Sequence, residues 1–168
     1  RGHDGMYGVI PTEPCAAGAD LAVLFTHQEG YSTMCGHATI AIGRWAVDTG
    51  RVALVDGKPR FGLEAPCGVI QVEVEADEGS GARVAFESVP SFANALDRTV
   101  EVSGLGPVRV DITFGGAFYA ILPASRIGLS LMETPLAELV QAATAITEAI
   151  RGGAPIALDR RRGGLNRR

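Results

Sequence analysis

The order of apolar and polar residues along the chain predicts many short strands and two helices. From 69 to 75, Ile70, Val72 and Val74 alternate with polar or smaller neighbours, and this period of two is typical of a half-buried strand. Residues 77–81, Asp-Glu-Gly-Ser-Gly, predict a hairpin turn after that strand. Further short apolar runs predict strands at 21–25, 84–86, 100–102, 108–112 and 117–122.

Two longer stretches predict helices. From Gly36 to Thr49 apolar residues occur on nearly every side, as in a buried helix, and Gly50 suits the left-handed conformation that often ends one. A second, amphipathic helix follows, with apolar residues at three- and four-residue spacing until Gly152. Thr134 and Pro135 are its predicted N-cap and first helical residue.

Strands on both sides of a central helix predict an α+β fold, in which a curved sheet wraps around the helix that follows Cys35. A chain of 168 residues, 46% of them hydrophobic, can form one packed domain, and we expect that domain to span 1–155. Residues 156–168 hold Arg160, Arg161, Arg162, Arg167 and Arg168 without an apolar period, which predicts a basic, disordered tail.

Charge and cysteine content narrow the function classes. A net charge of -4 argues against nucleic-acid binding, and no apolar run approaches the ~18 residues of a membrane span. The three cysteines have unrelated spacings, which disfavours a disulfide framework or a zinc site. We therefore expect no nucleic acid and no membrane among the partners, and a reducing, cytoplasmic location.

Cys35 is the most informative candidate for chemistry, because it stands directly before the first predicted helix. A thiol there faces unpaired backbone N–H groups and the positive end of the helix dipole, which favour its ionised form. The N–H groups of Gly36 and His37 can also hold a carboxylate. One short turn could thus bind an acid and attack it.

Other polar residues have simpler interpretations. The Cys67–Gly68 pair precedes a strand pattern, so Cys67 is predicted to be a small core residue, and Cys15 in its loop receives no role. We do not expect His37 to contact Cys35, because residues two apart at a helix start point to different sides. His27 is predicted to lie on the surface and Tyr7 in the core. Gly115 and Gly116 are predicted to permit a bulge or close packing on a strand.

The segment around Cys35 resembles a known family. Residues 30–41, GYSTMCGHATIA, are similar to the first active-site motif of the proline racemase family. Further segments match the family in the same order: RGHDGMYG at 1–8, Ala19-Asp20 with Phe25, VPSF at 89–92 and VDITFGGAFYA at 110–120. The resemblance covers roughly residues 1 to 125. Because the chain opens within a family motif, we expect a fragment.

The resemblance implies a fold and a mechanism. Members have the diaminopimelate-epimerase-like fold, two α+β halves with the active site between the N-termini of their central helices, and this chain resembles the first half. They need no cofactor, and Cys35 matches the residue that takes the α-proton of a small-molecule substrate, proline or hydroxyproline. His37 matches a residue near the ring nitrogen or hydroxyl, His3 could support the cleft, and Tyr7 could lie over the substrate ring. A homodimer is a further expectation.

Three readings of function follow from the resemblance. A trans-3-hydroxy-L-proline dehydratase is favoured, because that subgroup is most similar to the residues around Cys35, to Ile42-Gly43-Arg44 and to Val47-Asp48. The alternative is a proline racemase or 4-hydroxyproline 2-epimerase, in which a second cysteine, rather than a threonine, opposes Cys35. No segment after Ser125 resembles that second half. The third reading is an inactive remnant that folds but turns nothing over.

Overall fold

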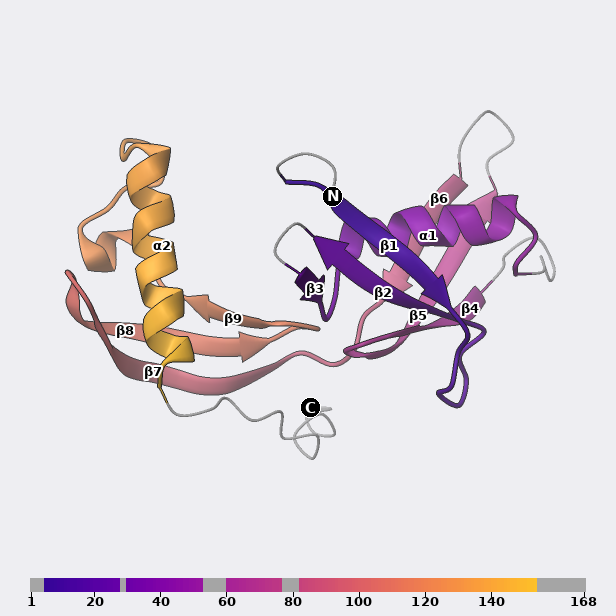
Figure 1. The fold of residues 1–168 in the computed structure, drawn as a ribbon, viewed down its shortest axis with the longest axis horizontal. Helices are drawn as coiled ribbons and strands as arrows, with labels where there is room; N and C mark the ends of the chain where they lie inside the picture. The colour runs from indigo at the N-terminus through magenta and orange to yellow at the C-terminus, as the bar shows by residue number, and fades with distance from the viewer. Residues whose placement is uncertain (1–4, 28–29, 53–59, 77–81, 154–168) are drawn as a thin grey trace. The chain divides into compact units, whose positions relative to one another are not determined.

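The computed structural model describes residues 5–27, 30–52, 60–76 and 82–153. They belong to two compact units, Arg1–Val89 and Pro90–Arg168, whose helices and strands are labelled in Figure 1. Each unit has a hydrophobic core of its own. The expected single body over 1–155 therefore contains two separate clusters of buried side chains. Its boundary stays a prediction, because the basic tail and the turn at 77–81 lie outside the described residues.

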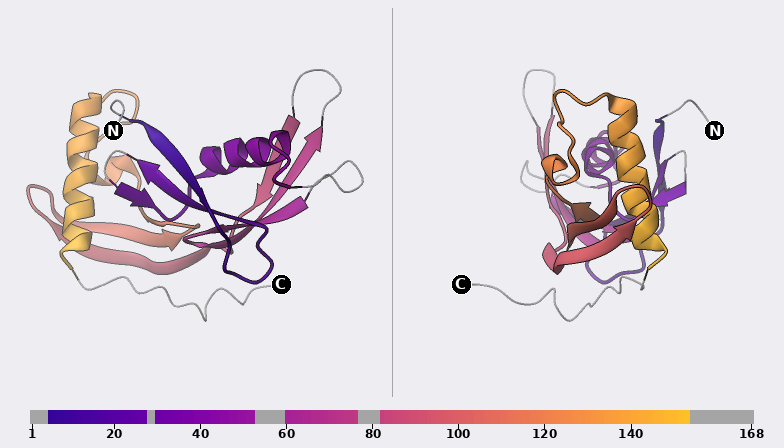
Figure 2. Two further views of the ribbon diagram at one scale, coloured as in Figure 1. Left: turned by 45° about the vertical axis from the view of Figure 1, so that its right-hand side comes forward. Right: turned by 90° about the vertical axis from the view of Figure 1, so that its left-hand side faces the viewer.

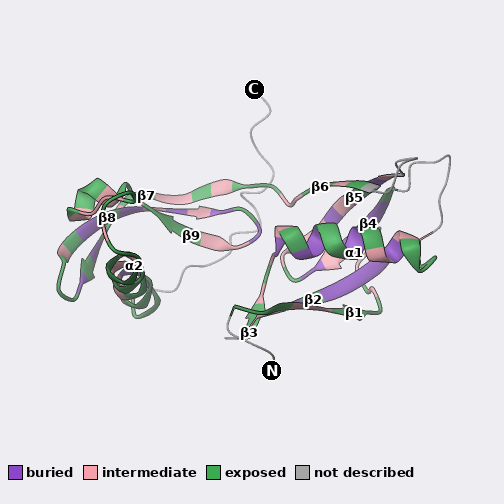
Figure 3. Cartoon of the chain, turned by 90° about the horizontal axis from the view of Figure 1, so that it is seen from above, coloured by how far each residue is buried: buried purple, intermediate pink, exposed green. Residues whose placement is uncertain are grey.

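A six-stranded sheet and one helix make up the first unit. The sheet has the order β1-β2-β4-β5-β6, and β3 pairs with β2. Only the β2–β4 pairing is parallel among the described strand pairs. Helix α1 (Gly36–Asp48) lies inside the curve of this sheet (Figure 3). The strands are β1 (Tyr7–Thr12), β2 (Leu21–His27), β3 (Gly30–Ser32), β4 (Arg60–Ala65), β5 (Gly68–Ala76) and β6 (Ala82–Glu87).

This arrangement confirms the predicted α+β class and the curved, mainly antiparallel sheet around a central helix. The alternation at 69–75 is also confirmed, because Ile70, Val72 and Val74 of β5 are buried against α1. Gly43 permits this close packing: a Cβ atom there would lie 2.8 Å from Cγ1 of Val84 on β6. The sheet therefore fixes where α1, and with it Cys35, stands.

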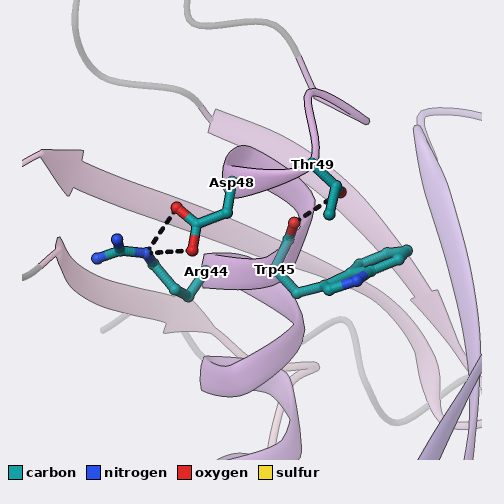
Figure 4. Close-up of polar contacts among 4 residues, drawn as sticks. All are labelled: Arg44, Trp45, Asp48 and Thr49. Atoms are coloured by element: carbon teal, nitrogen blue, oxygen red, sulfur yellow. Dashed lines mark hydrogen bonds and ion pairs between the residues drawn. The ribbon is translucent and has the colours of Figure 1, made fainter.

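The end of α1 is held by its own side chains (Figure 4). The Arg44 Nε donates to the Asp48 carboxylate at 2.7 Å, and the Thr49 hydroxyl donates to the Trp45 carbonyl at 2.7 Å. Gly50 has a φ of 65°, which confirms its predicted left-handed conformation. The helix thus ends one residue before the predicted Thr49, which is its C-cap.

In the second unit, three antiparallel strands support a helix (Figure 2). The strands are β7 (Phe92–Val102), β8 (Gly106–Phe114) and β9 (Phe118–Ile121), followed by the 3₁₀ helix η1 (Ala124–Ile127) and by α2 (Leu136–Arg151). Ile146 and Ile150 of α2 belong to the same buried cluster as residues of β7 and β8, namely Val100, Val102, Val108, Val110 and Ile112. The predicted strands and the amphipathic helix are confirmed, although Leu136 and Val140 of that helix remain exposed.

Two local predictions in the second unit were wrong. Pro135 is the N-cap of α2, whereas the Thr134 hydroxyl accepts a hydrogen bond from the Ser130 N–H at 2.9 Å and is occupied by the preceding turn. Gly115 and Gly116 do not lie within a strand. They join β8 to β9, where the Gly115 N–H donates to the Ala117 carbonyl at 3.0 Å and Gly116 has a φ of 93°.

Candidate active site

Cys35 is the N-cap residue of α1. It follows the short strand β3, and its backbone is extended, with a φ of -145° and a ψ of 106°. The residue is only 7% exposed and packs at the edge of the first core. Its side chain makes no capping hydrogen bond, so the sulfur is available for other contacts.

Thr39 fixes the backbone of Cys35 from one helical turn further on. Its N–H and its hydroxyl group both donate to the Cys35 carbonyl, each at 2.9 Å. Thr39 is fully buried in the core beneath the helix. The position of Cys35 is therefore set by buried contacts, not by its own side chain.

His37 lies next to the Cys35 sulfur. The Cys35 Sγ is 3.5 Å from the His37 Nδ1 and 3.9 Å from its Nε2. The expectation that these two side chains point to different sides was wrong. Helical spacing does not apply here, because the backbone of Cys35 is extended and lies outside the helix.

The Tyr7 ring also packs against His37. The two rings meet edge to face, with centroids 5.1 Å apart and an interplanar angle of 73°. Tyr7 also lies next to His27, its partner in the β1–β2 ladder, with the ring centroids 5.8 Å apart. Tyr7 is 52% exposed, so the predicted core tyrosine was wrong, whereas His27 is half-buried and lines a surface hollow.

The first turn of α1 begins directly after Cys35 and carries backbone N–H groups without intrahelical partners. The Thr39 N–H is the first in the helix to donate to a backbone carbonyl, that of Cys35. The N–H groups of Gly36 and His37 come before it and have no carbonyl within the helix to donate to. The turn contains no acidic residue that would compete for them. Such a turn favours an anion, and a carboxylate is the simplest ligand of that kind.

A hollow of about 370 Å³ opens where β1 and β3 begin and β2 ends. Tyr7 and His27 are among its lining residues, so this hollow shares a wall with the ring that contacts His37. Its full lining consists of Met6, Tyr7, Gly8, Thr26, His27, Gly30 and Tyr31. The antiparallel register of β1 and β2, in which Tyr7 faces His27, brings these two residues together.

The other two cysteines lie in different surroundings. The Cys15 thiol donates to the Glu64 carboxylate at 3.1 Å, and this hydrogen bond and the negative charge raise the pKa of Cys15. Burial raises the pKa of Cys67, which packs against the first core as predicted. All three cysteines are free thiols. His3 lies outside the described residues.

Two kinds of feature are absent from the described part of the chain. No helix there is long and apolar enough to cross a membrane. Within the same residues, no group of three His, Cys, Asp or Glu side chains is arranged to hold a metal ion.

Comparison with known proteins gives the site a context. The family model described as "Proline racemase" matches residues 1–160. A trans-L-3-hydroxyproline dehydratase of Saccoglossus kowalevskii is 46% identical over 151 residues, which are 90% of this chain and 46% of the relative. A 4-hydroxyproline 2-epimerase of Streptosporangium roseum is 39% identical over 150 residues, 89% of this chain and 45% of the relative.

A solved structure shares the fold. The crystal structure of a probable proline racemase from Agrobacterium radiobacter superposes with a TM-score of 0.78 at 24% identity, over 90% of this chain and 45% of that one. The chain thus spans about half the length of the curated relatives that it matches.

Proposed function

The chain belongs to the proline racemase family, and from this premise we propose that it supplies the Cys35 side of an active site that removes the α-proton of a proline-type amino acid. The observation that carries the proposal is the position of Cys35 as the N-cap of α1, with its sulfur 3.5 Å from the His37 Nδ1. The chemistry needs no cofactor, because a thiolate base and donors to the carboxylate suffice.

We propose dehydration of trans-3-hydroxy-L-proline as the reaction. The 46% identity to a dehydratase supports it. The Cys35 thiolate takes the proton from C2, and the negative charge spreads onto the carboxylate, which the N–H groups of Gly36 and His37 stabilise. The electron pair then forms the C2–C3 double bond while the hydroxyl group leaves as water after it is protonated. The enamine that results tautomerises to a cyclic imine.

The second candidate is epimerisation or racemisation, and the 39% identity to a 4-hydroxyproline 2-epimerase supports it. In that reaction the same first step is followed by return of a proton to the opposite face of C2. Family resemblance assigns this return to a second cysteine and assigns threonine to dehydratases. We propose that the deciding residue lies outside residues 1–168.

α-Proton exchange in D₂O, followed by NMR, tests the proposal. The complete protein that contains this chain should exchange the C2 proton of its substrate, and Cys35→Ser should reduce exchange by at least about a hundredfold, because a hydroxyl group is a far weaker base at neutral pH. Cys67→Ser is the matched control and should retain exchange. Full exchange in the Cys35→Ser protein would overturn the assignment.

The product distinguishes the two candidates. Dehydration gives a cyclic imine from trans-3-hydroxy-L-proline, whereas epimerisation interconverts 4-hydroxyproline diastereomers. Residues 1–168 alone should show no measurable turnover, since the substrate would lack its opposing wall and the associated positioning.

Cellular location and oligomeric state are two further parts of the proposal. Three free thiols support a reducing, cytoplasmic location. A homodimer stays a prediction, which light scattering on the complete protein would check.

A further inference from the structure

We propose that Tyr7 is a positioning residue that holds the His37 imidazole ring against the Cys35 sulfur. This inference rests on the proposed role of Cys35 as the base, and it assigns to a residue of β1 an effect on a thiol at the start of α1. Tyr7 does not touch the sulfur in the contacts described above, so it would act through His37.

The first step is the geometry at the sulfur. The Cys35 Sγ lies 3.5 Å from the His37 Nδ1 and 3.9 Å from its Nε2, so a ring nitrogen is within hydrogen-bonding distance of the thiol. A neutral imidazole nitrogen can accept the S–H proton, and an imidazolium stabilises the thiolate that results. A ring held at this distance can take up the S–H proton when Cys35 reacts.

The His37 ring is restrained by its contact with Tyr7. His37 is exposed, so solvent leaves its side chain free to rotate unless a neighbour restrains it. Tyr7 meets it edge to face, a preferred arrangement for aromatic pairs, at 5.1 Å and 73°. Without the tyrosine ring, His37 would lose this restraint and spend less time beside the sulfur.

The pairing of β1 with β2 holds Tyr7 in place. The antiparallel register of β1 and β2 places Tyr7 opposite His27, and the two rings are 5.8 Å apart. Next to this pair, Gly8 faces Thr26, where a Cβ atom would lie 2.7 Å from the threonine hydroxyl oxygen. The close approach at the next residue along β1 thus depends on glycine, and the sheet determines where the Tyr7 ring stands.

The test is a double-mutant cycle on the rate at which iodoacetamide alkylates Cys35 at pH 7, read by mass mapping in the protein of residues 1–168. Tyr7→Leu should slow Cys35 by about three- to tenfold, the range expected for loss of an aromatic contact. Tyr7→Phe should stay within about twofold, because it keeps the ring. Tyr31→Leu is the control, since Tyr31 lines the same hollow and is 72% exposed.

The cycle separates positioning from general destabilisation. If Tyr7 acts through His37, the double variant Tyr7→Leu/His37→Asn should react at the rate of His37→Asn alone. Additive losses, an unchanged rate in Tyr7→Leu, or a faster one would each overturn the proposal. If Tyr7→Leu accelerates Cys67, which reports opening of the core, Tyr7→Met carries the test instead.

The alkylation assay contains no substrate, so its result tests the positioning role of Tyr7 separately from the proposed reaction. Loss of the Tyr7 effect with intact α-proton exchange would remove only the positioning role. A Tyr7 effect in a complete protein that exchanges no α-proton would remove only the proposed reaction.

Discussion

The Thr39 hydroxyl group donates a hydrogen bond to the Cys35 carbonyl at 2.9 Å, from a side chain that is fully buried. The Thr39 N–H donates to the same oxygen, so the carbonyl accepts two hydrogen bonds. The thiol of the candidate active site is therefore attached to a backbone that the core holds in place, although the cysteine side chain caps nothing.

Replacing Thr39 by valine should destabilise the protein by about 0.5–1.5 kcal/mol, because valine keeps the shape but loses one buried hydrogen bond. Thr49→Val is the matched control. Thr49 makes the same kind of bond, to the Trp45 carbonyl at 2.7 Å, but in an exposed position where water can replace it. Urea unfolding should show a clear loss for the first variant and a smaller one for the second, and equal losses would contradict this account.

The three thiols should react with iodoacetamide at different rates at pH 7. We expect Cys35 to react first, because Glu64 raises the pKa of Cys15 and burial raises that of Cys67, and neither lies at a helix N-terminus. Mass mapping after partial alkylation measures the order. Labelling of Cys67 ahead of Cys35 would refute it.

Glu64→Gln offers a test of the Cys15 environment alone. Removing the negative charge should lower the pKa of Cys15 and accelerate its alkylation, while the rate of Cys35 stays the same. An unchanged Cys15 rate would show that the carboxylate has no influence on this thiol.

Glu64 should also make stability depend on pH in the acid range. Hydrogen bonds from the N–H groups of Ala16 and Cys15, and from the Cys15 thiol, hold the pKa of Glu64 below its ordinary value of 4.5. A pKa that is lower in the folded state means that the carboxylate stabilises the fold above pH 4.5 and that this contribution disappears as the pH falls through the folded-state pKa. The advantage of wild type over Glu64→Gln in urea unfolding should therefore shrink below pH 4.5. An advantage that persists unchanged to pH 3 would argue against these bonds.

Gly43→Ala should destabilise the first unit by about 1–3 kcal/mol, because the new methyl group would overlap valines of the sheet. Its Cβ would lie 2.8 Å from Val84 Cγ1 and 3.0 Å from Val72 Cγ1. Alanine otherwise favours a helix over glycine by about 1 kcal/mol, so a stabilised variant would mean that the helix can shift outward at little cost. Gly115→Ala, whose Cβ would meet nothing within 4 Å, is the control for unfolding measurements.

Sequence reasoning reached most of the fold because its signals are local. The alternation at Ile70, Val72 and Val74 and the glycine after α1 depend only on neighbouring residues, and both predictions are confirmed. The N-cap of α2 was wrong because Thr134 bonds to a turn that the sequence does not reveal.

The candidate site was harder to predict, since its members come from three elements. The position of Cys35 at a helix start is confirmed by the structure, whereas its role as a base and the roles of Gly36 and His37 stay predictions. The contact between His37 and Cys35 depends on one extended residue, and that between Tyr7 and His37 depends on packing across the sheet. Neither contact produces a periodic pattern of apolar residues in the sequence.

The parallel pairing of β2 with β4 has a consequence for folding kinetics. The chain between these strands contains β3 and α1, so the helix that begins after Cys35 is part of the crossover that joins them. Their pairing brings together residues as far apart in sequence as Asp20 and Gly62, which are 42 positions apart. Because such distant contacts form slowly, the surroundings of Cys35 should be completed late on the folding pathway, and protection of its thiol would report the final step.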